Sequence, residues 1–199
     1  NYIRFITADN FGVNKFNYDI HKYLFPNQEY GNGEFMSFNN NYSLDIEGTK
    51  ISQDNATKFI VKEKLSDFQI TSMPKLETSI NIGDFKLELK YDYFNVMIGN
   101  KPNVLPILTR NSYIKLNKAI ESYKENDYEA TEQELISDFV HQFPDVSYDY
   151  ANTLHKAQGL TFDIVIYDKS TTDFLKLKRG EPGQDNAFYT ATTSPKNLL

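Results

Sequence analysis

The segment from Tyr150 to Asp163, YANTLHKAQGLTFD, most constrains the fold of this chain, because it places a polar turn between two strand-like patterns. Before the turn, Val146, Tyr148 and Tyr150 alternate with polar residues, which is typical of a half-buried strand. After it, residues 163–168 (DIVIYD) form a short apolar run bounded by acids, which is typical of a central parallel strand. Open α/β sheets bind their ligands at such strand ends. The pattern predicts an α/β fold with a ligand site at this turn.

The turn concentrates several kinds of polar group. Thr153, His155, Lys156 and Gln158 supply a hydroxyl, an imidazole, an ammonium and an amide, and Gly159 permits close approach of the backbone to a phosphate. Such groups position nucleic-acid phosphates. The alternative is a plain surface turn between two elements. No nucleophile or acid/base pair accompanies His155, so the sequence predicts a binding role and no catalytic residue.

The amino-terminal residues have the pattern of a strand followed by a helix. Residues 2–8 are strand-like, and Asp9 or Asn10 can cap a helix. The apolar residues that recur near helical spacing are Val13, Phe16, Ile20 and Leu24. Taken alone, this is a βα unit, in which we expect His21 to be structural.

Three segments together resemble the motifs of superfamily 1 DNA helicases, most closely the Dda/RecD branch and its UvrD-like C-terminal domain. Residues 150–168 resemble motif V, residues 3–24 resemble motif IV, and residues 188–199 (FYTATTSPKNLL) resemble motif VI, commonly written YVA-x-TR-x-x-K. The matching residues in motifs IV and VI are Thr7, Asn10, Val13, Asn17, Tyr189, Ala191, Thr193 and Lys196. Ser194 stands where the family carries an arginine that reaches the γ-phosphate of ATP.

The resemblance implies a RecA-like domain of the P-loop NTPase type, the second in such helicases, formed by residues 1–30 and 145–199. It also implies an inserted SH3-like β-barrel at residues 31–110, followed by connecting helices at residues 111–144. In the family the site residues fall into two groups. The implied nucleic-acid contacts are Thr7, Asn10, Thr153, His155, Lys156 and Thr161, and the implied ATP-cleft residues are Gln158, Gly159 and Ser194. The implied partners are single-stranded DNA and the first RecA-like domain of the same protein, which would bind most of the ATP and Mg²⁺.

The middle of the chain has a different sequence pattern, in which short strand-like segments are separated by polar turns. The expected strands are residues 34–38, 58–61, 76–82, 85–91, 94–98 and 104–108, and turns are expected at residues 39–41, 47–48, 83–84 and 99–100. Several short antiparallel strands suggest a small barrel.

Two helices are expected after these strands. Tyr113, Leu116, Ile120 and Tyr123 lie on one face of the first, and Thr131 to Glu134 form a capping-box pattern that opens the second. The stripe that continues along the second helix is Leu135, Phe139 and Phe143, with Pro144 ending it. His141 is expected to be structural, and the acids of this region are expected to form a solvated face rather than a metal site.

Composition limits the function classes. The net charge of −6 and only three arginines argue against a protein that coats DNA by bulk electrostatics. The absence of cysteine excludes disulfides and suits a cytoplasmic protein, and no run of apolar residues is long enough to cross a membrane. No G-x-x-x-x-G-K-[ST] pattern occurs. We therefore expect the C-terminal part of a larger ATP-dependent DNA helicase, inactive alone.

Two alternatives stay open. Ser194 in place of the arginine favours a non-catalytic, helicase-like module that binds nucleic acid or regulates. The other alternative is an α/β interaction domain whose motif similarity is due to chance.

Overall fold

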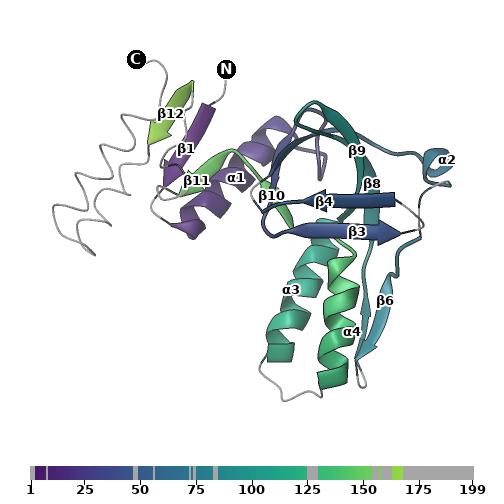
Figure 1. Ribbon diagram of the computed structural model, residues 1–199. Helices are drawn as coiled ribbons and strands as arrows, with labels where there is room; N and C mark the ends of the chain where they lie inside the picture. The colour runs from purple at the N-terminus through teal and green to yellow at the C-terminus, as the bar shows by residue number, and fades with distance from the viewer. Residues whose placement is uncertain are drawn as a thin grey trace. The chain divides into compact units, whose positions relative to one another are not determined.

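A computed structural model describes residues 3–7, 9–46, 49–55, 57–71, 73, 75–82, 85–124, 130–153, 157 and 163–167. The chain divides into two compact units, Asn1–Asn27 with Tyr148–Leu199, and Gln28–Ser147 (Figure 1). The first unit thus combines the two ends of the chain, and the second is inserted between them.

The first unit contains a three-stranded parallel sheet. Strand β1 (Ile3–Thr7) lies in the middle, with β11 (Ala151–Thr153) on one side and β12 (Ile164–Tyr167) on the other. This confirms the predicted α/β class with a parallel sheet. The prediction that residues 163–168 form a central strand is wrong for the described sheet, because β12 lies at its edge and Ile166 is 43% exposed.

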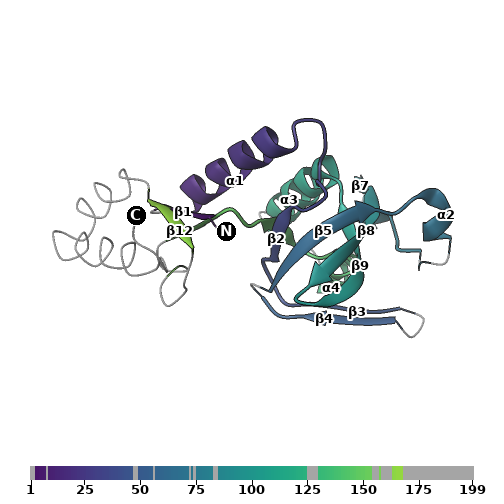
Figure 2. The same ribbon diagram turned by 90° about the horizontal axis from the view of Figure 1, so that it is seen from above.

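Helix α1 (Asn10–Leu24) follows β1 and packs against β1 and β11 (Figure 2). Its N-cap is Asp9, one of the two predicted caps, and the Asp9 carboxylate accepts a hydrogen bond from the Gly12 N–H at 2.8 Å. The ring of Phe16 stacks on that of Phe5, with centroids 5.3 Å apart. Leu24, predicted to belong to the apolar face, is 50% exposed because the helix ends at this residue.

The expected strand at residues 146–150 is divided between two sheets. Strand β10 (Val146–Tyr148) belongs to the sheet of the second unit, and β11 begins at Ala151 in the parallel sheet. Between them, the Asp149 side chain pairs with Arg4, and the Tyr150 carbonyl accepts a hydrogen bond from the Phe5 N–H at 3.0 Å. Alternation of polar and apolar residues therefore continues across a point where the chain changes sheet.

The second unit is built on an antiparallel sheet with two additional hairpins. The sheet order is β10-β2-β5-β8-β9, and its other strands are β2 (Phe35–Phe38), β5 (Lys58–Lys64), β8 (Tyr91–Ile98) and β9 (Lys101–Leu108). The hairpins are β3 (Tyr42–Ile46) with β4 (Thr49–Gln53), and β6 (Ser79–Ile82) with β7 (Phe85–Glu88). In the described part, β9 and β10 are the edges of the main sheet, and an SH3-like barrel stays a prediction.

The six strands expected between residues 34 and 108 all overlap observed strands, with shifts at their ends. The turn expected at residues 99–100 is also confirmed, and Gly99 supplies the positive φ of 59° that the β8–β9 hairpin requires. The β3–β4 hairpin was not predicted. The first strand, YSLDI, does alternate apolar with polar residues, so the period-two signal was present and was overlooked, whereas TKISQ carries one apolar residue, Ile51.

Three helices complete the second unit, namely α2 (Asp67–Ile70), α3 (Arg110–Lys124) and α4 (Ala130–His141). α3 contacts β7, and α4 contacts β6 and β3. Leu116 and Phe139 are buried as predicted, but Leu135 is 58% exposed, so the expected stripe on α4 is wrong at this residue. α4 begins at Ala130, which places Thr131 inside the first turn rather than at the predicted N-cap. Among the described helices, none has the length and apolarity to cross a bilayer.

Buried and half-buried tyrosines connect elements of the second unit through their hydroxyl groups. Tyr42 is 5% exposed, and its hydroxyl donates to the Gln142 carbonyl at 3.2 Å. The Tyr113 hydroxyl donates to the Asp145 carboxylate at 3.0 Å. Burial, and for Tyr42 the nearby Tyr93, raises the pKa of Tyr42 above its ordinary value of 10.0. The pKa values of Tyr93 and Tyr113 are raised as well, chiefly by burial.

These tyrosines make the second unit sensitive to alkali. Because the folded state holds the Tyr42 proton more tightly than the unfolded chain, the stabilisation is complete below the ordinary pKa of 10.0 and is lost as the pH rises above it. We expect the free energy of unfolding to fall as the pH rises above 10. Tyr42→Phe should make this fall less steep, although it also removes the hydrogen bond to Gln142. Urea unfolding across the alkaline range measures it. Tyr23→Phe, at an 84% exposed tyrosine, is the control, and an equal flattening in both variants would contradict the assignment.

Candidate functional site

Two of the predicted site residues lie in register at the carboxyl ends of neighbouring strands in the parallel sheet. We call this place the strand edge. Thr7 is the last residue of β1, Thr153 is the last residue of β11, and the two strands pair in parallel with Thr7 opposite Thr153. Since the carboxyl ends of parallel strands are where open α/β sheets bind ligands, this edge is the candidate site. Two segments that are far apart in the sequence, and that were each predicted to contact phosphate, therefore end side by side.

The turn after β1 is organised by the Thr7 hydroxyl. This side chain is 1% exposed, and its Oγ1 donates to the Asp9 carbonyl at 2.8 Å and accepts from the Asp9 N–H at 3.3 Å. The Thr7 hydroxyl thus shapes the turn from within. Asn10, the first residue of α1, is exposed at the same end of the strand. Of these two predicted contacts, Asn10 is the accessible one.

Gly12 allows the first turn of α1 to lie against this threonine. A Cβ atom on Gly12 would lie 2.6 Å from Thr7 Oγ1 and 2.9 Å from Thr7 Cβ, both too close for real atoms. This role of Gly12 was not predicted from the sequence. A glycine three residues after a capping acid was the available signal, since glycine in a helix costs stability unless close packing requires it.

The path into β11 is fixed by two side chains from the amino-terminal segment. Asn17 is buried in α1, and its Oδ1 accepts hydrogen bonds from the backbone N–H groups of Tyr150 at 2.9 Å and Ala151 at 2.8 Å. Arg4 is fully buried and pairs with the Asp149 carboxylate at 2.7 Å, and its guanidinium also donates to the Asp149 carbonyl. These contacts hold the residues immediately before Thr153.

His21 supports the same segment from the next turn of α1. It is 6% exposed, and its ring stacks on Tyr148 with centroids 4.2 Å apart and planes 7° from parallel. This packing is the structural role predicted for His21. His141 lies, as expected, in the last turn of α4 and is exposed.

The remaining predicted site residues lie outside the described residues, and their roles stay predictions. They are His155, Lys156, Gln158, Gly159, Thr161 and Ser194. Between Lys156 and Gln158 in the sequence, Ala157 is described and is fully buried. In the described part of the chain, no group of three or more His, Asp or Glu side chains is arranged to hold a metal ion.

Comparison with known proteins adds no family, because no family model matches the chain and no curated protein matches it significantly. Its function is therefore inferred from the geometry of the strand edge and from the sequence motifs.

Asn17 provides a direct test of how the site is held. Asn17→Ala leaves two backbone N–H groups near β11 without their acceptor, which we expect to cost about 2 to 4 kcal/mol of unfolding free energy. Asn14→Ala makes the same chemical change at an exposed position of α1 and should alter stability by less than about 0.5 kcal/mol. Urea unfolding gives the energies, and hydrogen exchange shows whether protection is lost at Tyr150 and Ala151. Equal losses of unfolding free energy in both variants would show that the Asn17 side chain does not hold the segment that leads into β11.

Proposed function

We propose that this chain is the second RecA-like domain, with an SH3-like insertion, of an ATP-dependent superfamily 1 DNA helicase of the Dda/RecD type. Its strand edge at β1 and β11 contacts single-stranded DNA. The observation that carries the proposal is the register of Thr7 opposite Thr153, because it brings the segments that resemble motifs IV and V to one edge.

In this proposal the side chains of the edge have distinct tasks. The Thr153 hydroxyl donates to a DNA phosphate, and Asn10 offers an amide beside it, while Thr7 keeps the turn in shape. His155, Lys156 and Thr161 extend the contact along the strand. The first RecA-like domain would hold most of the ATP and Mg²⁺, and ATP hydrolysis would supply the energy for opening and closing the cleft between the two domains. The resemblance assigns Gln158, Gly159 and Ser194 to that cleft.

The net charge of the chain fits a protein that binds DNA through a few local contacts rather than one that coats DNA with a basic surface. A net charge of −6 repels phosphates at long range, so attachment depends on a few positioned donors and cations. Binding by this chain alone is therefore weak, sensitive to salt and selective for single strands, whose backbone can follow a narrow edge.

Replacement of one hydroxyl tests the proposed contact. Thr153→Val keeps the branched shape that suits a strand but removes the donor, so we expect affinity for a labelled oligodeoxythymidine to fall about tenfold. Thr57→Val makes the same change in a loop of the second unit and should leave affinity unchanged. Fluorescence anisotropy at low salt measures both. If Thr153→Val binds like the parent chain, this edge does not hold DNA.

Ser194 supports a second candidate function, a helicase-like module that binds nucleic acid without hydrolysing ATP. An arginine at this position of the motif stabilises charge on the transferred phosphoryl group, and serine cannot. A helicase that hydrolyses ATP with Ser194 has rerouted its chemistry and gains little from an arginine, whereas a module that has lost hydrolysis needs the arginine to regain it.

In a protein that carries this chain together with a Walker-type nucleotide-binding domain, we expect Ser194→Arg to raise DNA-stimulated ATP hydrolysis at least about tenfold. Steady-state phosphate release measures the rate, and Ser194→Lys controls for charge without the planar guanidinium. An unchanged rate, in a folded variant that binds ATP, would mean that another cation acts or that the motif VI alignment is wrong.

A further inference from the structure

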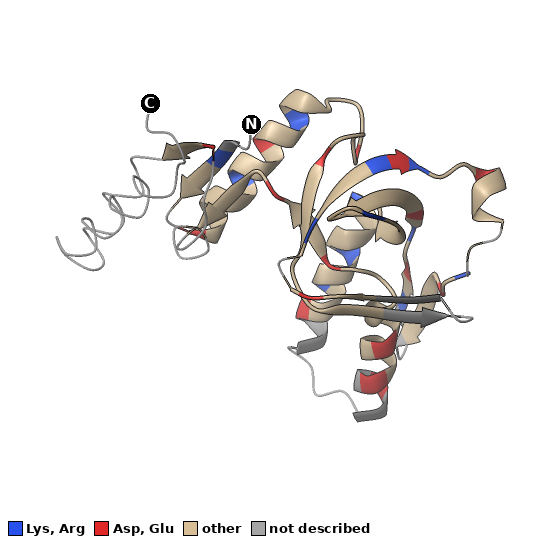
Figure 3. Cartoon of the chain, turned by 45° about the horizontal axis from the view of Figure 1, so that its top comes forward, with Lys and Arg blue, Asp and Glu red and all other residues tan. Residues whose placement is uncertain are grey.

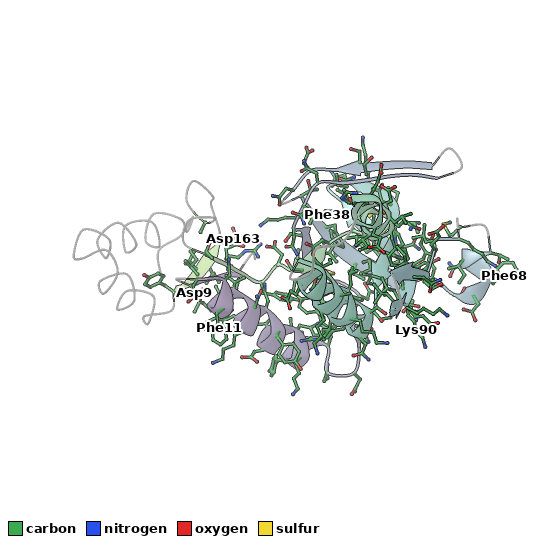
Figure 4. The ribbon with its side chains drawn as sticks, turned by 90° about the horizontal axis from the view of Figure 1, so that it is seen from below. Asp9, Phe11, Phe38, Phe68, Lys90 and Asp163 are labelled. Carbon is green, nitrogen blue, oxygen red and sulfur yellow. The ribbon has the colours of Figure 1, made fainter. Side chains whose placement is uncertain are left out.

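Helix α1 has a second face that the parallel sheet does not cover. Phe11 is 78% exposed and Tyr18 is 39% exposed, and Lys15 and Lys22 are exposed between and beyond them. Basic residues appear as blue segments of this helix in Figure 3, and Figure 4 shows Phe11 on its outer side. We call these four residues the α1 stripe.

Helical geometry places the four side chains in a single row. They are separated by steps of four, three and four residues, which at 3.6 residues per turn keeps them within about 60° of one another around the axis. At a rise of 1.5 Å per residue, the row is about 16 Å long. The buried Asn17 and His21 lie outside this row, about 130° and 90° around the axis from its middle, so the stripe is turned away from the packed side of the helix.

The composition of the stripe points to a particular ligand. Aromatic rings alternate with ammonium groups, and single-stranded nucleic acids present the matching alternation of flat bases and charged phosphates. The stripe carries two positive charges in a chain of net charge −6, so it offers phosphate a local attraction that the chain as a whole does not. Asn14 lies beside the row, and Asp19 lies on its flank.

We propose that the α1 stripe is a binding surface for single-stranded nucleic acid, with Phe11 and Tyr18 stacking on bases and Lys15 and Lys22 contacting phosphates. The inference rests on the proposed function and extends it. α1 begins at Asn10, beside the strand edge, so the stripe starts at Phe11 where that edge ends. A strand that leaves Thr153 and Asn10 continues along the outer side of the helix.

The test uses the full 199-residue chain and a fluorescein-labelled oligodeoxythymidine, with a duplex of equal length for comparison. Phe11→Ala/Tyr18→Ala should weaken single-strand binding at least about tenfold, because each ring removed is a stacking platform for a base. Lys15→Gln/Lys22→Gln should lower the slope of log affinity against log salt by about 1.4, or about 0.7 for each phosphate that the protein no longer neutralises.

Matched controls separate the stripe from general effects. Tyr23→Ala removes an 84% exposed ring from the same helix but off the row, and Lys62→Gln/Lys118→Gln removes two exposed lysines of the second unit. Both should bind like the parent chain. All of the substituted side chains are exposed, so circular dichroism should show unchanged folding in every variant.

The outcomes distinguish this inference from the proposed function. If the stripe variants bind like the parent while Thr153→Val is weaker, the stripe is wrong and the strand edge stands. If the stripe variants are weaker and Thr153→Val is not, the stripe stands and the edge is wrong. If the parent binds no oligonucleotide, the inference is overturned. Sedimentation would then show whether Phe11 and Tyr18 instead join two copies of the chain.

Discussion

The first unit depends on a buried ion pair between Arg4 and Asp149, which are 145 residues apart in the chain. Neither charge can be buried alone without a large loss of solvation, so each requires the other in place. The pair fixes the backbone as it leaves β10, and this position lets Asn17 accept from the next two N–H groups. Strand β11 then pairs with β1, and Thr153 reaches the edge opposite Thr7. The candidate site follows from this sequence of contacts.

Much of the fold was predictable where burial leaves a local pattern. The run after Ile3, the helix that follows it, and the six middle strands carry periodic apolar residues that match their elements. The local apolar pattern predicts the structure wrongly where residues far along the chain determine which side chains are buried and which sheet a segment joins. Leu135 has helical spacing but faces solvent, and residues 146–150 alternate like one strand although the Arg4 pairing splits them. The β3–β4 hairpin was overlooked although Tyr42, Leu44 and Ile46 alternate with polar residues along β3, so this miss lies in the interpretation and not in the sequence.

The candidate site was predictable in its position and less so in its parts. The resemblance to helicase motifs pointed to Thr7, Asn10 and Thr153, and the structure places Thr7 and Thr153 at the ends of paired strands, while their predicted role in binding stays a prediction. Sequence matching marked Asn17 without revealing that its amide oxygen serves two backbone groups, because that role exists only once α1 lies on β11. The α1 stripe was missed for a different reason. Aromatic residues are usually core, and Phe11 and Tyr18 can be recognised as exposed only when the sheet-facing side of the helix is known.

The insertion between α1 and β11 also determines the order in which the first unit can be completed. During synthesis, β1 and α1 leave the ribosome well before β11, and at about 5 to 20 residues per second the 145 residues between Arg4 and Asp149 take roughly 7 to 30 seconds. In that interval Arg4, Asn17 and His21 have none of their partners from β10 and β11. The nascent helix therefore exposes polar groups that are buried in the folded protein. The whole second unit is synthesised before the first unit can complete its sheet. A cell that makes this protein must tolerate, or shield, that half-finished sheet.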